Sequence, residues 1–128
     1  MRLEGDEPGS RVAAALDGAG TIIGLATAGT TRDDDLATPW ELYSINVTAP
    51  EQGSGVADDL IRAVAGEGDG DAAVWVLARN TRARRFYRRH GFTVEGASAV
   101  DEFTGARRIR MVRVSGLPQA DAEKSTIG

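Results

Sequence analysis

Hydrophobic and polar positions follow two patterns along this chain, one typical of strands and one typical of helices. Segments rich in apolar and β-branched residues predict six strands, at 11–17, 21–31, 40–48, 72–78, 92–99 and 107–114. Between the third and fourth of these, apolar residues recur at helical spacing, namely Val56, Ala57, Leu60, Ile61 and Val64. This spacing predicts a helix over 54–65.

The segments between these patterns mark where the elements end. Gly18 and Gly20 predict a tight hairpin turn between the first two strands. Asn80 or Thr81 suits the N-terminal cap of a second helix that ends at His90, and Gly91 suits a left-handed C-terminal cap. Segments 1–10 and 115–128 predict flexible N- and C-terminal tails around one domain at 11–114.

The resulting order, β-β-β-α-β-α-β-β, predicts an α/β (α+β) fold. The strand–helix–strand step in the middle implies a parallel pair, and the flanking hairpins imply antiparallel neighbours, so the sheet is expected to be mixed and mainly antiparallel. In the third strand, alternation predicts two faces, one with Glu41, Tyr43, Ile45 and Val47 and the other with Trp40, Leu42, Ser44 and Asn46.

Composition narrows the class of protein. The 128 residues suit one domain, no apolar run reaches the roughly 18 residues of a membrane span, and segment 1–10 lacks the features of a signal peptide. The absence of cysteine rules out disulfides and a thiol nucleophile, and it fits a reducing, cytoplasmic location. His90 is the only histidine, so no metal site is expected, and the acidic run 33–35 is better explained as an exposed loop.

Charge is distributed unevenly. Segment 79–90 holds six arginines and no acidic residue. Because the whole chain has a net charge of −4, the residues outside this segment carry −10. A local basic cluster on an acidic protein favours a small anionic ligand over general nucleic-acid affinity. A solvated helix face remains an alternative explanation for some of these arginines.

A glycine-containing loop separates the third strand from the first helix, with the sequence Gln52-Gly53-Ser54-Gly55-Val56-Ala57. Successive N–H groups at a helix start can bind an anion, and glycine lets the ligand approach the backbone. The loop lacks the Gly-Lys-Ser/Thr of nucleotide-triphosphate-binding loops and does not open a Rossmann unit. From this loop alone, a plain turn is equally well supported.

The second helix carries the other candidate residues. A rotation of 100° per residue places Asn80, Arg84 and Tyr87 in one sector, with Ala83, Phe86 and His90 beside them toward the core. The same rotation directs Arg82, Arg85 and Arg89 away. Tyr87 is thus expected at the border between the core and a site.

Together the two segments resemble the GNAT superfamily of acyl-CoA-dependent N-acyltransferases. The loop matches the family pattern Gln/Arg-x-x-Gly-x-Gly/Ala through Gln52, Gly55 and Ala57. The second segment matches Asn-x-x-Ala-x-x-Phe-Tyr…Gly-Phe through Asn80, Ala83, Phe86, Tyr87, Gly91 and Phe92. The resemblance covers about 11–114, and the two motifs occur in the family's order with one helix and one strand between them.

The resemblance implies how acetyl-CoA, the cosubstrate, would bind. The CoA diphosphate would lie on the amides of the loop, at Gln52, Gly53, Ser54, Gly55, Val56 and Ala57. The pantetheine arm would lie between two splayed parallel strands, 40–48 and 72–78, against the backbone of Ile45, Asn46 and Val47. Asn80 would hold the cosubstrate by its side-chain amide, and Arg84 would meet a CoA phosphate, with the 3′-phosphate as its natural partner.

The resemblance also implies the chemistry, transfer of an acetyl group to an amine acceptor. Tyr87 would protonate the departing thiolate, and strand amides at 45–47 would stabilise the oxyanion. Glu41 is the candidate base, with an ordinary exposed charge as the equal alternative, and Tyr43 could shape the acceptor pocket.

The chain departs from the family pattern at its start. The family opens with a strand and one or two helices that cover the acceptor site, whereas only about ten residues precede Arg11 here, so this region is expected to be missing or shortened. A bare sheet edge would favour a homodimer. Two alternatives stay open: an acyl-CoA-binding domain without catalysis, and, less favoured, a nucleic-acid-binding module that uses segment 79–90.

Overall fold

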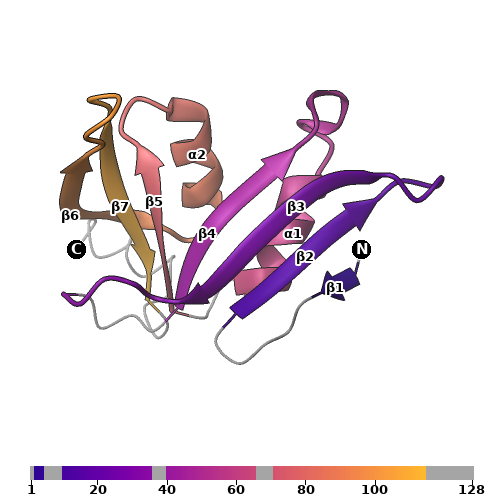
Figure 1. Ribbon diagram of the computed structural model, residues 1–128, viewed down its shortest axis with the longest axis horizontal. Helices are drawn as coiled ribbons and strands as arrows, with labels where there is room; N and C mark the ends of the chain where they lie inside the picture. Colours follow the sequence, from indigo (N-terminus) through magenta and orange to yellow (C-terminus); the bar gives the residue numbers. More distant parts are fainter. Residues whose placement is uncertain (1, 5–9, 36–39, 66–70, 115–128) are drawn as a thin grey trace, which may run out of the picture.

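The computed structural model describes residues 2–4, 10–35, 40–65 and 71–114 (Figure 1). Its strands are β1 (Arg2–Glu4), β2 (Ser10–Leu16), β3 (Ile22–Thr30), β4 (Trp40–Val47), β5 (Ala72–Leu77), β6 (Thr93–Val100) and β7 (Arg107–Arg113). Its helices are the short 3₁₀ helix η1 (Ala49–Glu51), α1 (Val56–Ala65) and α2 (Thr81–Arg89).

The strands form one sheet in the order β1-β2-β3-β4-β5-β7-β6. β4 and β5 are parallel, joined by the crossover helix α1, and the other neighbours are antiparallel. The predicted mixed, mainly antiparallel sheet with a central β-α-β-α unit is therefore confirmed.

Helix α1 packs against β2, β3 and β4 and supplies much of the core. Leu60, Ile61 and Val64 are fully buried against small alanine side chains of β2 and β3. The helix comes so close to β3 that a Cβ on Gly24 would lie 2.8 Å from Leu60 Cδ1 and 3.1 Å from Val56 Cγ1. Trp40 Nε1 of β4 also donates to the Val64 carbonyl at 2.8 Å. These contacts fix the position of α1 on the sheet.

Helix α2 is capped at both ends as the sequence predicts. The Asn80 side chain accepts from the Ala83 N–H at 3.0 Å, and Gly91 has φ 91°. The helix lies beside α1, because Arg89 and His90 both reach Asp58 in the first turn of α1. Buried Arg113 of β7 donates to the carbonyls of His90 and Ala65 and so ties the C-terminal ends of both helices to the sheet.

Strand β4 contains a β-bulge that the alternation analysis missed. Thr27 pairs with Ser44 and Ala28 pairs with Leu42, so Tyr43 has no partner on β3. The extra residue reverses the alternation beyond it. Leu42, Ile45 and Val47 all pack toward the helical core, while Glu41 and Tyr43 face Arg32 on the opposite side. The predicted common face for Glu41, Tyr43, Ile45 and Val47 is wrong.

Pairing between β4 and β5 ends where the bulge begins. The two strands pair only at Glu41↔Ala73 and Leu42↔Val74. A bulge bends the strand that carries it, which gives a physical reason for the divergence. Figure 1 shows the two strands starting side by side and then diverging, with α2 between them.

Two further differences from the sequence prediction lie near the N-terminus and at α1. Residues 2–4 form a strand paired with β2, within a segment for which we predict a flexible tail. Helix α1 begins at Val56 instead of 54, because Gly53 and Gly55 have φ of 85° and 97° and cannot be helical. The rest of 1–10 and the predicted tail at 115–128 lie outside the described residues, apart from Ser10.

The acidic loop after β3 is held by a buried arginine. Arg110 of β7 is 2% exposed. Its guanidinium donates to Asp33 at 3.0 Å, to Asp35 at 2.9 and 3.1 Å, and to Glu95 at 2.9 Å. These hydrogen bonds from Arg110 hold the pKa of both Asp35 and Glu95 below its ordinary value. Across the described ranges, no set of three or more His, Asp or Glu side chains is placed to hold a metal ion.

No helix in the described part of the chain has the length and apolar character that a membrane span requires.

Candidate functional site

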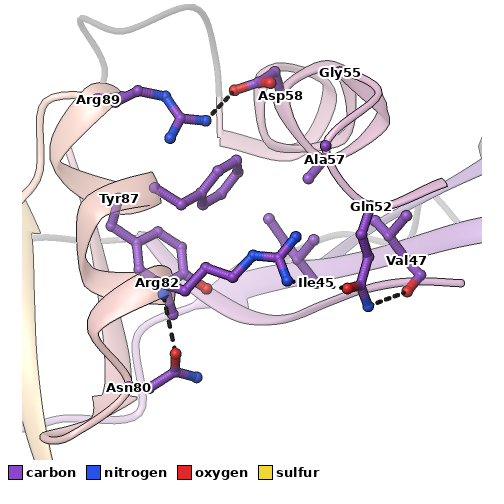
Figure 2. A pocket seen from close by; sticks show the side chains of 13 residues that line it. Ile45, Val47, Gln52, Gly55, Ala57, Asp58, Asn80, Arg82, Tyr87 and Arg89 are labelled. Atoms are coloured by element: carbon purple, nitrogen blue, oxygen red, sulfur yellow. Dashed lines mark hydrogen bonds and ion pairs between the residues drawn. The ribbon is translucent and has the colours of Figure 1, made fainter. Parts of the chain in front are cut away.

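A pocket of about 410 Å³ opens where β4 and β5 have separated, between the start of α1 and one side of α2 (Figure 2). Residues of β4, of the loop before α1, of the first turn of α1 and of α2 line it, namely Ile45, Val47, Gln52, Gly53, Gly55, Ala57, Asp58, Asn80, Arg82, Ala83, Phe86, Tyr87 and Arg89. The two sequence motifs, about 30 residues apart in the chain, thus meet in one cavity.

The strand side of the pocket presents backbone groups. Ile45 and Val47 pair with Ala26 and Gly24 of β3 on one edge. On the other edge, β4 has no pairing with β5 beyond Leu42 in the described residues. Every strand residue has an N–H and a C=O, so an unpaired edge offers hydrogen bonds to an extended ligand.

The glycine loop (residues 52–55) forms a second side of the pocket. A Cβ at Gly53 or Gly55 would meet nothing within 4 Å, so both glycines are required for their positive φ and not for space. This backbone path turns the chain directly into α1, whose first-turn N–H groups have no acceptor within the helix. The loop and the positive end of the helix dipole therefore favour a phosphate or another anion.

Tyr87 supplies a buried hydroxyl on the α2 side. Its ring is 9% exposed and packs edge-on against Phe86 and Phe92, with centroids 5.3 and 5.8 Å away. Burial raises the pKa of Tyr87 to about 12. The hydroxyl is thus protonated at neutral pH and can act as a proton donor. Figure 2 shows the side chain projecting from α2 into the pocket.

Two polar links connect α2 with the opposite wall. Arg82 donates to Gln52 Oε1 at 3.0 Å, and Arg89 forms an ion pair with Asp58 at 3.3 Å. His90 Nε2 also lies 2.6 Å from Asp58 Oδ1. Burial alone would raise the pKa of Asp58, but the hydrogen bonds from His90 and Arg89 outweigh it and leave that pKa below its ordinary value. The carboxylate in the pocket wall therefore accepts hydrogen bonds from two side chains, Arg89 and His90.

A model of the acetyltransferase (GNAT) domain matches residues 8–94, more than half of the chain. The chain belongs to the GNAT acetyltransferase family. The comparison with curated proteins finds no match.

Solved GNAT structures share the fold. A Corynebacterium glutamicum structure, described as histone acetyltransferase HPA2 and related acetyltransferase, has 23% identity and a TM-score of 0.68, with 87% of this chain and 67% of that chain covered. Arabidopsis thaliana NAA60 bound to acetyl-CoA has 19% identity and a TM-score of 0.63, with 84% of this chain and 77% of that chain covered. A second NAA60 structure, with a bisubstrate analogue, has a TM-score of 0.66 at 19% identity, with 84% and 76% covered. At these identities the likeness shows the common fold.

Most of the residues expected from the GNAT motifs lie in the pocket. Eight of the predicted binding residues line it, namely Ile45, Val47, Gln52, Gly53, Gly55, Ala57, Asn80 and Tyr87. Asn46, Ser54, Val56 and Arg84 are not among the lining residues. Ser54 donates instead to the Glu51 carbonyl at 2.5 Å, which stabilises the turn at the start of the glycine loop.

The arginine assignment on α2 is reversed. Arg84 donates to the Ala78 carbonyl at 2.8 Å, whereas Arg82 and Arg89, which were expected to point away, line the pocket. The error arises because Asn80 has φ −82° and ψ 80° and is outside the helix. A 100° rotation counted from Asn80 therefore starts from the wrong angle.

The predicted orientations of Phe86 and Tyr87 also differ from those in the structure. Phe86, expected only in the core, is half-buried and lines the pocket, while Tyr87 is the more buried of the two. Sequence reasoning also missed Asp58, and the signal for it was available, because it is the third residue of α1 and follows Ala57 of the motif.

Glu41 lies on the other face of the sheet from Ile45. It is 2% exposed, and it pairs with Arg32 through the guanidinium at 3.0 Å and through the backbone N–H at 2.9 Å. The alternative of an ordinary exposed charge is therefore wrong. The Arg32 guanidinium also lies 4.1 Å from the centre of the Tyr43 ring. Glu41 and Tyr43, both expected near an acceptor, therefore contact the same arginine.

Proposed function

We propose that this chain is an N-acetyltransferase that transfers the acetyl group of acetyl-CoA to an amine acceptor by direct attack on the thioester. The observation that carries the proposal is the convergence, in one pocket, of an unpaired strand edge, an anion-binding loop and a protonated tyrosine hydroxyl. Family membership supports the acetyl transfer, and the amine acceptor is the part that we infer.

The residues present fit acetyl-CoA. The glycine loop and the first turn of α1 would receive the diphosphate, and the open edge of β4 at 45–47 would bond the pantetheine amides. Asn80 would contribute its amide NH₂ group, because its oxygen accepts the capping bond from Ala83. When bound, the thioester supplies the activated acetyl group.

The protein's own groups would move the protons. A C–N bond forms as the C–S bond breaks, the thiolate takes the Tyr87 hydroxyl proton, and a base takes the proton of the amine. We propose Glu41 as that base, acting from the opposite face of the sheet where β4 and β5 separate; the support is its place one residue before their pairing ends. Backbone N–H groups at 45–47 would stabilise negative charge on the acetyl oxygen.

Calorimetry of the full chain with acetyl-CoA tests the first half of the proposal. We expect saturable binding and a raised melting temperature, because a ligand that binds only the folded state stabilises it. Absence of both at millimolar acetyl-CoA contradicts the proposal.

A screen of amine acceptors, scored by release of free CoA thiol, tests the second half. Binding without turnover on any amine would favour the acyl-CoA-binding domain without catalysis. Salt-dependent binding to DNA or RNA would favour the nucleic-acid-binding alternative.

A cytoplasmic location and a homodimer remain predictions. The lack of cysteine supports the first. For the second, β6 is a sheet edge with mostly exposed side chains, and equilibrium sedimentation of the full chain measures the association.

A further inference from the structure

Arg82 spans the mouth of the pocket from α2 to the glycine loop. Its guanidinium donates to Gln52 Oε1 at 3.0 Å, and the Gln52 amide nitrogen donates in turn to the Val47 carbonyl at 3.3 Å. Figure 2 shows the three side chains in a row, from α2 across to β4. Arg82 is thereby held next to the residue that precedes Gly53.

The two arginines that line the pocket differ in how their charge is compensated. Arg89 faces the carboxylate of Asp58. Arg82 hydrogen-bonds to a neutral amide, and within the described ranges no carboxylate lies at ion-pair distance from it. Of the five N–H donors of a guanidinium, one is used by Gln52, so others can reach a ligand.

We propose that Arg82 is the cation that binds the diphosphate of CoA, and that Gln52 positions its guanidinium beside the glycine loop. The inference rests on the proposed function, since it assigns a ligand group within the same pocket. It replaces Arg84, whose guanidinium is turned to the Ala78 carbonyl.

The diphosphate is favoured over the 3′-phosphate by position. Arg82 contacts the first residue of the glycine loop, and the same loop leads into the N-terminus of α1, where an anion is stabilised by backbone N–H groups. A phosphate there would receive hydrogen bonds from the backbone and from Arg82 together. Hydrogen bonds between ions are about twice as strong as neutral ones, so the guanidinium is expected to matter for affinity.

Calorimetric titration of the full chain with CoA and with dephospho-CoA tests the assignment. Both ligands carry the diphosphate, and only CoA carries the 3′-phosphate. We expect Arg82→Gln to weaken both ligands by about tenfold or more, and Arg82→Lys, which keeps the charge, to weaken them less. Arg85→Gln is the matched control, because Arg85 is exposed on the same helix and does not line the pocket.

Three outcomes would overturn the inference. These are equal affinities for Arg82→Gln and Arg85→Gln, a loss for CoA but not for dephospho-CoA, and a loss in Arg82→Lys as large as in Arg82→Gln. Thermal melts of each variant establish that it is folded. If the unsubstituted chain binds neither CoA nor acetyl-CoA, the proposed function fails; if it binds both and Arg82→Gln binds as tightly, only this inference fails.

Discussion

The Tyr87 hydroxyl is the group whose removal separates chemistry from packing most cleanly. Tyr87→Phe keeps the ring contacts with Phe86 and Phe92. We expect turnover to fall by roughly 100- to 10,000-fold, as for loss of a positioned acid, with little change in acetyl-CoA affinity. Steady-state kinetics with an identified acceptor, together with calorimetry, measure both quantities.

The pH profile adds a check on the same residue. Because its pKa is about 12, Tyr87 remains protonated from pH 7 to 10, and it should cause no loss of kcat in that range. If Tyr87→Phe turns over at the same rate as the unsubstituted chain, the Tyr87 hydroxyl serves only in packing.

Single residues also show where sequence analysis succeeds and fails. The left-handed conformation of Gly91 was predicted from its place after the second helix, whereas that of Gly55 was missed, because the predicted helix over 54–65 included it. The exchange of Arg82 for Arg84 was missed as well, because the rotation was counted from Asn80, which caps α2 and does not share the 100° spacing of the helical residues.

At the level of elements, the close contact between β3 and α1 positions the helix that follows the glycine loop. We expect Gly24→Ala to destabilise the fold by about 1–3 kcal/mol, since the new Cβ would overlap Leu60 and Val56 in a filled core. Any displacement of α1 also moves its first turn, so acetyl-CoA binding should weaken. Urea unfolding and calorimetry test this, with Gly18→Ala as control because nothing lies within 4 Å of that position.

Equal stability of the two glycine variants would mean that α1 shifts without strain.

The link between α1 and α2 through Asp58 should give a pH-dependent stability. The pKa of Asp58 is lower in the folded chain than its ordinary value of 3.8. The stabilisation is therefore present above about pH 4 and is lost as the pH falls through the folded-state pKa. We expect Asp58→Asn to lower the free energy of unfolding at pH 7 by at most about 1 kcal/mol.

Unfolding curves of the unsubstituted chain and of Asp58→Asn are compared at pH values from 7 to 3. The difference between the two proteins should shrink as the pH falls, because acid removes the same interaction in the unsubstituted chain. A difference that stays constant over that range would assign the effect to packing.

Apart from β1 and the short helix η1, the element types and their order followed from the sequence pattern. The bulge at Tyr43 did not, because an unpaired residue is defined by the neighbouring strand. That one residue also explains why Glu41 and Ile45, which alternation places together, lie on opposite faces.

Across the whole molecule, the Arg110 cluster joins parts of the chain far apart in sequence. Asp33 and Asp35 follow β3, Glu95 lies on β6, and Trp75 of β5 donates to Asp33 at 2.9 Å. Such a pairing has no local sequence signal, so only the general prediction of an acidic loop was accessible.

Replacing Arg110 should destabilise the contacts between these segments. We expect Arg110→Met to destabilise the chain by about 2–4 kcal/mol, because three carboxylates lose their common partner. Arg107→Met, at an exposed position of the same strand, is the matched control. Chemical denaturation measures the stability of both variants, and losses of similar size would show that the ion pairs of Arg110 contribute little.

The unpaired Tyr43 also bears on which changes in length this protein tolerates. Shortening a regular strand by one residue turns every later side chain to the other face, whereas removal of a bulged residue leaves the faces on either side as they were. A chain without Tyr43 would still direct Ile45 and Val47 toward α1 and α2, but β4 would run straight and could continue pairing with β5. Insertions and deletions at position 43 would therefore change how far β4 and β5 separate at the pocket, but not which side chains line the pocket.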